Sequence, residues 1–418
     1  MRTGEVTFSG YRRRARKSIG VRNHILVIPT VFCANAVAGR IENHFRDCAF
    51  GEYEENKVVA INHGSGCCHI GFDEYLSRYA LESIAMHPNI GGCLIVHLGC
   101  GQFCTNPRKE EQDYNMGEII KKRSMKNVRT VNIQKYGAEE AIKKGIEKVE
   151  HLMEKLSSEK REKCTLSGIM LSVLNGASDP TSGLFANPCA GYISDFVIHH
   201  GGSVVFSQTP ELIGAEEIAI NKCVSKKRSK LKKMIETTLT IENALREKGA
   251  LKVSNPTQGN IQSGISTLAE KSIGTILKAG HDEDIKIRDV LTTYKRISLY
   301  NGLYFMEGPG QDLLNLTGMV VGGSQCALFT TGMGTPMGSA VAPVVKMTAN
   351  KETYEKMKDS IDVYIPIEEI FNEKKSLKDI SIKSILPYLL KILSGKILTK
   401  SEIAGQRDFQ IRNTWMMV

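Results

Sequence analysis

Long apolar runs are missing from this 418-residue chain, and none approaches the ~18 residues that a membrane-spanning helix requires. The basic N-terminal segment MRTGEVTFSGYRRRARKS is not followed by an apolar stretch, so the sequence predicts neither a transmembrane helix nor a signal peptide. A P-loop, a GxSxG elbow, a HExxH helix and internal repeats are also absent. With 41% apolar and 24% charged residues, the composition is that of an ordinary soluble globular protein.

Disulfide and zinc-finger spacings are missing as well. The chain has 11 cysteines, an odd number, and they are scattered without the spacing of a disulfide scaffold. No CxxC pair occurs, so a structural zinc site is not expected. Free thiols or metal ligands in a reducing cytosol are therefore the expectation, and the predicted location is cytoplasmic.

Basic residues exceed acidic ones and give a net charge of +10. Lysines and arginines lie mostly in helical stretches, of which 141–163 and 225–248 are examples, where they are mixed with glutamates. This pattern is typical of solvated helix faces rather than of a nucleic-acid surface. One cluster of basic residues contains no acidic residue. It lies next to Gly20–Asn23, where it could hold an anionic substrate or a partner subunit. Its members are Arg12, Arg13, Arg14, Arg16 and Lys17.

Short apolar runs alternate with segments of helical periodicity along most of the chain. The runs 24–29, 58–62, 93–98, 129–134, 167–174, 203–207 and 326–329 are predicted strands. Helices are predicted at 34–45, 73–86, 138–160, 192–199, 225–248, 265–278 and along SILPYLLKILSGK. This alternation indicates βαβ units, so the predicted fold class is α/β, with two domains of mostly parallel, doubly wound sheets.

The stretch 301–350 combines short apolar runs with nine glycines. The predicted strand at Cys326–Phe329 leads directly into Thr330, Thr331 and a glycine-rich loop. Gly-rich ligand loops at the carboxyl ends of strands hold anionic ligands in many α/β proteins. A set of tight turns without a ligand is the alternative.

Other polar residues also follow predicted strand ends. The carboxyl ends of parallel strands meet at one edge of a sheet, so these residues are expected to converge. Histidine and cysteine together suit a transition metal, although cysteine is also a common small buried residue. The residues are Cys33, Asn35, His63, Cys67, Cys68, Cys100 and Cys104.

Seven motifs in the same order resemble the altronate and galactarate dehydratase family from about residue 10 to about residue 410. They are GYRR…GVRN with PTVFCAN (10–35), HGSGC (63–67), HPN…LGC (87–100), GASD..SG..ANP (176–188), NPTQGN..SGISTLAEKSIG (255–274), PGQD (309–312) and FTTGMGTPMG…K..AN (329–350). The resemblance implies a second-domain-like unit over 1–136 and a C-terminal catalytic domain over 137–418. It also implies the large subunit of a split enzyme, whose small antifreeze-like (SAF) domain is on another polypeptide; a homo-oligomer is a further option.

The resemblance implies a hydro-lyase that dehydrates a sugar acid such as altronate to a 2-keto-3-deoxy acid, with a divalent metal, Fe²⁺ or else Mn²⁺. The implied metal ligands are His63, Cys67 and Cys100. The implied substrate-binding residues are Arg22, Asn23, Asn260, Thr330, Thr331 and Lys346. The implied base is Lys271 or His87, and Asp179 is a further candidate for acid or ligand.

Five positions depart from the family pattern. Asn175 stands where the family has Cys, Gly101 and Gln208 where it has Glu, Ile261 where it has Lys, and Met333 where it has Arg. Loss of an Arg and a Lys removes anion-binding capacity, which disfavours a dicarboxylate such as galactarate. A carbon–sulfur lyase resembling sulfolactate sulfo-lyase, and a non-catalytic binding subunit, remain the alternatives.

Overall fold

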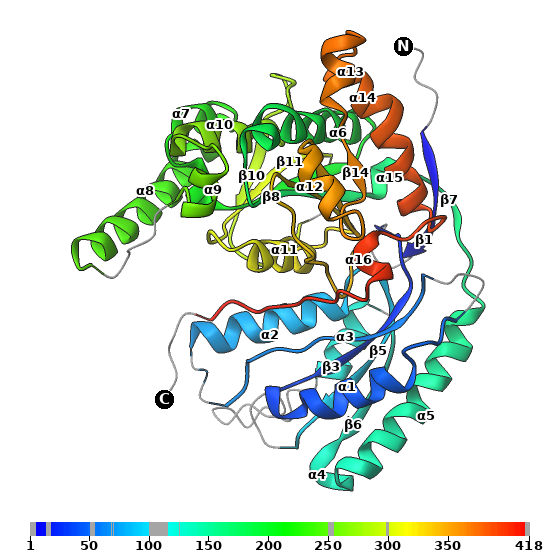
Figure 1. Cartoon of the computed structure of the whole chain (residues 1–418). Helices are drawn as coiled ribbons and strands as arrows, with labels where there is room; N and C mark the ends of the chain where they lie inside the picture. Colours follow the sequence, from blue (N-terminus) through cyan, green and yellow to red (C-terminus); the bar gives the residue numbers. More distant parts are fainter. Residues whose placement is uncertain are drawn as a thin grey trace.

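The computed structural model describes residues 6–13, 18–50, 55–67, 69, 71–99, 116–124, 126–249, 255–297 and 301–413. The described residues form three sheets, and two of these are entirely parallel and carry helices on both faces (Figure 1). This arrangement confirms the predicted α/β class. No helix of the described part of the chain is long and apolar enough to cross a bilayer.

The first sheet has the order β4 (Val58–Ala60), β3 (His24–Pro29), β5 (Ile90–His97), β6 (Asn127–Asn132). In β3, Ile25 and Val27 pack with α1 (Asn35–His44) and α5 (Ala138–Ser157), whereas Leu26 and Ile28 point to the opposite face. That face is covered by α2 (Phe72–Ala85) and α3 (Met116–Ser124). Side chains of a strand alternate between faces, so the apolar run HILVIP fits a strand that is buried on both.

The second sheet has the order β10 (Ile287–Leu291), β11 (Gly302–Met306), β9 (Ser203–Phe206), β8 (Met170–Gly176), β12 (Cys326–Thr331), β13 (Val344–Thr348), β14 (Val363–Tyr364). One face packs against α6 (Asn187–His199), α8 (Ser225–Glu247), α10 (Leu268–Leu277) and α15 (Leu386–Leu393). The other face packs against α11 (Asp312–Val321). The sheet is therefore doubly wound, as predicted.

A small antiparallel sheet, β2 (Ser18–Gly20), β1 (Thr7–Arg13), β7 (Glu162–Thr165), lies between the two larger ones. One apolar core is shared between the units, because α2 contacts α11 and residues of both parallel sheets belong to the same cluster. The segment after α16 (Lys400–Ile403) runs alongside α2 in Figure 1 and contributes Ile411 to this core.

The remaining short elements connect these layers. They are η1 (Phe32–Ala34), α4 (Ile133–Tyr136), η2 (Leu166–Gly168), η3 (Ser182–Ala186), η4 (Thr209–Leu212), α7 (Glu216–Asn221), α9 (Gln258–Gln262), α12 (Lys351–Lys356), α13 (Ile367–Asn372), α14 (Leu377–Ile380) and η5 (Ser381–Ile385). The predicted domain boundary at residue 136 stays a prediction. The helix that follows it, α5, packs on β5 and β6 of the first sheet.

The predicted strand at 24–29 is confirmed residue for residue. Two other segments differ from the prediction for local reasons. The strand predicted at 129–134 ends at Asn132, because the Asn132 side chain accepts a hydrogen bond from Lys135 N and caps the short helix α4. The helix predicted from residue 192 begins at Asn187, where Pro188 occupies its first turn.

Candidate functional site

The strand order of the second sheet reverses between the neighbouring strands β8 and β12. From β8 the chain continues to β9 on one side, whereas β12 lies on the other side and leads to β13. The last residues of both strands are paired, Asn175 with Thr330 and Gly176 with Thr331. Ligands of open α/β sheets bind at such switch points, beyond the carboxyl ends of the strands.

Four charged side chains and two amides gather at this switch point, and we call them the lysine–carboxylate cluster. They are Asn175, Gln208, Glu211, Lys271, Lys278 and Asp312. Four different segments supply them: β8, the η4 segment after β9, helix α10 with its C-cap residue, and the first residue of α11. Lys271 and Lys278 are seven residues apart, two turns of helix, so both reach Glu211 from α10.

Glu211 lies between the two lysines. Its carboxylate is 3.2 Å from Lys271 Nζ and 3.8 Å from Lys278 Nζ. It also accepts hydrogen bonds from Asn175 Nδ2 at 3.3 Å and from Thr275 Oγ1 at 3.2 Å. These contacts keep a buried carboxylate paired and hydrogen-bonded, as a charge in an apolar interior requires.

Lys278 has no exposed surface, and its ammonium donates to the side-chain oxygens of Asn175 and, at 3.4 Å, Gln208. Burial lowers the pKa of Lys278 to about 8. Gln208 donates through its amide nitrogen to Asp312 Oδ1 at 3.0 Å. Burial, with the nearby charge of Glu211, raises the pKa of Asp312 to about 7. A base and an acid that both titrate close to neutral pH therefore lie on either side of one glutamine.

The backbone around the cluster is strained at non-glycine residues. Gln208 has φ = 81° and Ala177 has φ = 44°, both in the left-handed region that side chains with a Cβ avoid. A Cβ on Gly176 would collide with the carboxylate of Asp312, so this close approach needs glycine. Strain of this kind is concentrated at functional sites.

Three predicted residues lie at or beside the cluster. Lys271 donates to Asn255 Oδ1 at 2.9 Å and to Asn260 Oδ1 at 3.3 Å. Asn260 also donates to Ser178 O at 3.1 Å, which ties α9 to the loop after β8. Thr330 donates to Asn187 Oδ1 at the start of α6.

The predicted Thr331 and Asp179 organise the neighbouring loops. Thr331 Oγ1 accepts a hydrogen bond from Gly334 N at 2.9 Å. Asp179 accepts from Ser182 N at 2.7 Å and from Asn350 Nδ2 at 2.9 Å. Its carboxylate therefore holds two loops at the rim of the switch point in place.

Four other predicted residues do not reach the cluster. Arg22 is buried in an ion pair with Glu402 at 2.7 Å, so its guanidinium is already paired. Asn23 is also buried, and its Oδ1 accepts a hydrogen bond from Arg13. His87 precedes β5, at the amino end of the strand, and its Nε2 lies 2.9 Å from Ser324 O. Its Nδ1 accepts from Asn89 N, and burial lowers its pKa to about 3.

Lys346 is the fourth of these residues. Its ammonium donates to the backbone oxygens of Pro336 and Met337 at 2.9 and 3.0 Å. Burial lowers its pKa to about 8. The side chain therefore fixes the loop after β12 instead of facing the lysine–carboxylate cluster.

Of the three predicted metal ligands, the structure describes His63 and Cys67. His63 Nε2 lies 2.8 Å from Pro29 O and its Nδ1 accepts from Ser65 N, so both ring nitrogens are used. Cys67 is exposed, and Cys100 lies outside the described residues. Within the described ranges, no three or more His, Cys, Asp or Glu side chains are grouped so that they could hold a metal ion.

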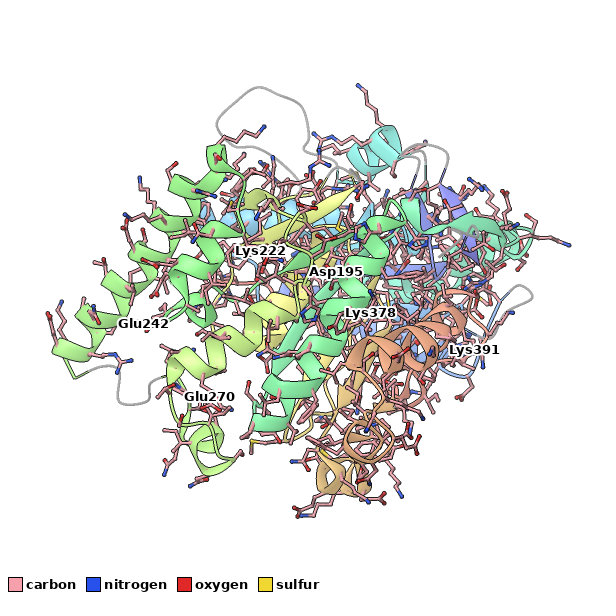
Figure 2. All side chains as sticks on the ribbon, turned by 90° about the horizontal axis from the view of Figure 1, so that it is seen from above. Asp195, Lys222, Glu242, Glu270, Lys378 and Lys391 are labelled. Carbon is pink, nitrogen blue, oxygen red and sulfur yellow. The ribbon has the colours of Figure 1, made fainter. Side chains whose placement is uncertain are left out.

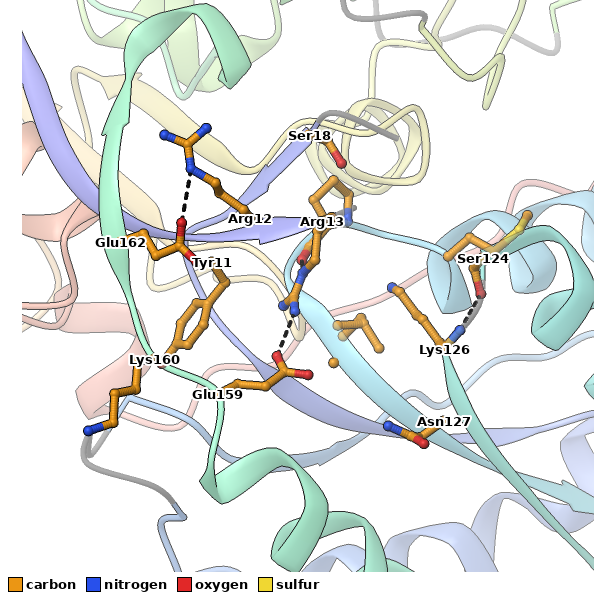
Figure 3. A pocket seen from close by; sticks show the side chains of 14 residues that line it. Tyr11, Arg12, Arg13, Ser18, Ser124, Lys126, Asn127, Glu159, Lys160 and Glu162 are labelled. Atoms are coloured by element: carbon orange, nitrogen blue, oxygen red, sulfur yellow. Dashed lines mark hydrogen bonds and ion pairs between the residues drawn. The ribbon is translucent and has the colours of Figure 1, made fainter. Parts of the chain in front are cut away.

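The basic cluster of the N-terminus is also distant from the switch point. Arg12 and Arg13 line a separate cavity of about 420 Å³ near the start of β5 (Figure 3). Each has an acidic partner, Glu162 at 3.1 Å and Glu159 at 3.0 Å. Arg14, Arg16 and Lys17 lie outside the described residues.

Sequence reasoning missed Lys278, Glu211 and Asp312. One signal was available, because Asn175 and Gln208, two of the five departures from the family pattern, contact Lys278 directly. Two more departures, Ile261 and Met333, are exposed. The fifth, Gly101, lies outside the described residues.

Comparison with known proteins gives two matching family models. One, described as D-galactarate dehydratase/Altronate hydrolase, second domain, matches residues 10–157, and the other, D-galactarate/Altronate dehydratase, C-terminal, matches residues 166–417. The altronate dehydratase of Bacillus subtilis is 30% identical over 392 residues, 94% of this chain and 75% of the relative. That of Escherichia coli is 33% identical over 350 residues, 84% of this chain and 67% of the relative. The (2R)-sulfolactate sulfo-lyase subunit beta of Chromohalobacter salexigens is 27% identical over 406 residues, 96% of both chains.

Proposed function

The chain belongs to the D-galactarate/altronate dehydratase family, and we propose that it is a hydro-lyase that dehydrates a sugar acid at the lysine–carboxylate cluster. The observation that carries this proposal is that Lys278 and Asp312, a base and an acid with pKa values of about 8 and about 7, lie on either side of Gln208 at the switch point of the sheet. Relatives named altronate dehydratase, at 30–33% identity, support the sugar-acid substrate.

The proposed reaction is a β-elimination from a 2,3-dihydroxy acid. The neutral amine of Lys278 removes the proton at C2, next to the carboxylate. Protonated Asp312 donates a proton to the hydroxyl that leaves C3, which departs as water. The enol product tautomerises to a 2-keto-3-deoxy acid. Lys278 ends the cycle protonated and Asp312 ionised, and solvent restores both.

Lys271 and Asn260 are proposed to bind the substrate carboxylate. The ammonium of Lys271 can pair with an anion near the rim of the cluster. Hydrogen bonds to Asn255 and Asn260 already hold it in place. This assignment gives Lys271 a binding role in place of the base role expected from the family resemblance. Lys278 is better suited to be the base, because an ammonium without exposed surface loses its proton more readily.

A divalent metal, Fe²⁺ or Mn²⁺, remains a proposal that depends on Cys100. His63 does not fit as a ligand, because both of its ring nitrogens are in hydrogen bonds, and no step of the mechanism uses a metal. Metal analysis of the purified chain beside Cys100→Ser and Cys67→Ser tests the site. Loss of bound iron only in Cys100→Ser would support a centre near residue 100, and equal metal content in all three proteins would oppose one.

We further propose that the chain works with a second, small polypeptide. The relative that it matches over 96% of both lengths is named a subunit, which supports this arrangement. Co-expression with a candidate SAF-domain protein, followed by co-purification and light scattering, tests it. Recovery of the large chain alone, with full activity, would contradict it.

The second candidate function is a carbon–sulfur lyase acting on a sulfonate such as sulfolactate. Its motivation is the same sulfo-lyase relative. The elimination uses the same proton abstraction, but sulfite leaves instead of water. Sulfite release from a 3-sulfo-2-hydroxy acid, without turnover of any sugar acid, would favour this candidate.

The test is a panel of aldonates and aldarates with the purified chain, with and without a small partner and Fe²⁺ or Mn²⁺. Formation of a 2-keto acid is expected, together with exchange of the C2 proton in D₂O. Lys271→Met should raise KM, because it removes substrate binding, whereas the loss of Lys278 should abolish the exchange. A sugar acid that raises the Tm without turnover would instead support a non-catalytic binding subunit.

A further inference from the structure

We propose that Asn315 is a positioning residue of the lysine–carboxylate cluster, which holds the loop Gly308–Gln311 so that Asp312 stays buried beside Gln208. The inference rests on the proposed function, because it takes Asp312 as the acid of the elimination. It adds a residue that lies outside the cluster and acts on it only through the segments that carry its members.

The side chain of Asn315 lies on the first turn of α11 and is almost completely buried. Its amide nitrogen donates to Pro309 O at 2.7 Å and to Gln311 O at 2.6 Å, so both amide hydrogens are used. Its Oδ1 accepts a hydrogen bond from Ser207 Oγ at 2.7 Å. One amide group therefore joins the segment after β9 to the loop after β11.

These contacts flank two members of the cluster. Ser207 directly precedes Gln208, and Gln311 directly precedes Asp312. Gln208 Nε2 donates to Asp312 Oδ1 at 3.0 Å. A shift of either segment would therefore change this hydrogen bond and the burial of the Asp312 carboxyl group.

The two segments also contact each other through their backbones. Thr209 N donates to Gly308 O at 2.9 Å, and Gly308 N donates to Thr209 Oγ1 at 3.3 Å. A Cβ on Gly308 would collide with Asn315 Oδ1, so this close packing needs glycine. The approach of the two segments is thus arranged around the amide of Asn315.

The loop borders a cavity as well. Gly308, Pro309 and Gly310 line this cavity of about 440 Å³ together with residues of α8. The distal part of α8, where Glu242 is labelled in Figure 2, projects away from the body of the molecule. The loop therefore has room to move on this side, and the hydrogen bonds of Asn315 oppose that movement.

The acid role of Asp312 depends on its burial. Burial, with the charge of Glu211, raises the pKa of Asp312 to about 7, whereas Lys271, Lys278 and the hydrogen bond from Gln208 act in the opposite direction. Movement of the loop would expose the carboxyl group to water, so its pKa would fall toward the ordinary 3.8. Less of the acid would then be protonated near neutral pH, and kcat would fall without a matching change in KM.

Asn89 provides a matched control. It is fully buried, its amide nitrogen donates to Gln325 O at 2.9 Å and Val341 O at 3.0 Å, and its Oδ1 accepts from Val21 N at 2.9 Å. These are the same three kinds of contact that Asn315 makes, but Asn89 precedes β5, at the amino end of a strand of the first sheet. Asn89→Ala therefore removes an equivalent set of hydrogen bonds away from the cluster.

The experiment is a double-mutant cycle, measured by urea denaturation between pH 4 and pH 7. The difference in stability between a protein and its Asp312→Asn variant reports the titration of Asp312 in that background. In the wild-type and Asn89→Ala backgrounds, this difference should change with pH to the same extent. In the Asn315→Ala background the change should be about half as large or less, because Asp312 titrates at a lower pH.

Ser207→Ala is measured in parallel, so the test does not depend on the folding of Asn315→Ala. It removes the donor to Asn315 Oδ1 and leaves the amide nitrogen bonded, and it should give a smaller change in the same direction. A pH dependence equal to that of the wild type in both backgrounds would overturn the inference. So would an equal reduction in the Asn89→Ala background, because it would show a general effect of lost stability.

Turnover of a sugar acid separates this inference from the proposed function. The kcat of Asn315→Ala should fall by about tenfold or more, with KM within about twofold of the wild type, whereas Asn89→Ala should keep the wild-type kcat. A reduced pH dependence of stability with an unchanged kcat would overturn Asp312 as the acid and keep the positioning by Asn315. Absence of turnover in the wild type would overturn the proposed function, and the denaturation cycle would still decide the inference.

Discussion

Replacement of Lys278 by methionine should separate catalysis from stability. The side chain of Met has a similar length but no charge, and Lys278 has no exposed surface. The fall of the Lys278 pKa from its ordinary 10.5 to about 8 corresponds to about 3 kcal/mol, at about 1.4 kcal/mol for each unit of pKa. This is the free energy that the buried ammonium costs the folded state near neutral pH.

The substitution also removes hydrogen bonds from Lys278 to Asn175 and Gln208, which together contribute about 1–2 kcal/mol. Glu211 keeps Lys271 as its counter-ion at 3.2 Å, so no carboxylate is left unpaired. Lys278→Met should therefore be as stable as the wild type at pH 7, or more stable by about 1–2 kcal/mol. Its turnover should fall by about 10²–10⁴-fold, the usual contribution of a general base.

The stability difference between Lys278→Met and the wild type should depend on pH. The folded pKa of Lys278 lies below the unfolded value, so its contribution to stability is fully present above pH ~10.5 and is lost as the pH falls through about 8. The advantage of Lys278→Met in urea denaturation should accordingly shrink between pH 8 and pH 10. A variant with wild-type turnover, or one destabilised by more than ~2 kcal/mol at pH 7, would refute the reasoning.

Two further predictions concern Asp312 and Glu402. The folded pKa of Asp312, about 7, lies above its ordinary 3.8, so its contribution to stability is lost as the pH rises from about 4 to 7. Between pH 4 and pH 7, the free energy of unfolding of Asp312→Asn, measured in urea, should rise by about 2–4 kcal/mol relative to that of the wild type, while turnover falls. If the difference between the two proteins did not change with pH, a buried, protonated Asp312 would be contradicted. Glu402→Gln leaves the fully buried Arg22 without its counter-ion and should destabilise by about 3–5 kcal/mol, whereas Glu352→Gln in an exposed pair should have no measurable effect.

The fold was largely predictable because short apolar runs alternate with segments of helical periodicity along most of the chain. HILVIP has no polar residue after its first position, and only a strand buried on both faces explains such a run in a parallel sheet. Local polar chemistry was harder to anticipate. Asn132 resembles an ordinary strand residue in sequence, yet its side chain caps α4 and ends β6 two residues before the predicted end.

The candidate site was only partly predictable, because residue type does not show which partner a side chain meets. Arg22 and Lys346 have the chemistry of anion ligands, but one pairs with Glu402 and the other with backbone oxygens. Lys278 lies in no motif, and Asp312 ends the PGQD motif without any sign in the sequence of its buried partners. Their pKa values are shifted by burial and by nearby charges from other segments of the chain. Neither the burial nor these neighbours can be derived from the sequence of one segment.

The two amides beside Lys278 bear on whether the chain is a catalyst or a silent subunit. A glutamate at position 208 would stabilise the ammonium of Lys278 and raise its pKa. Gln208 instead offers only an amide oxygen at 3.4 Å, and Asn175 offers another, so burial dominates and the pKa of Lys278 falls to about 8. Amides at these positions therefore increase the fraction of neutral amine near pH 7. The departures from the family pattern weaken anion binding at the rim, but at the centre of the cluster they favour the base form that proton abstraction needs.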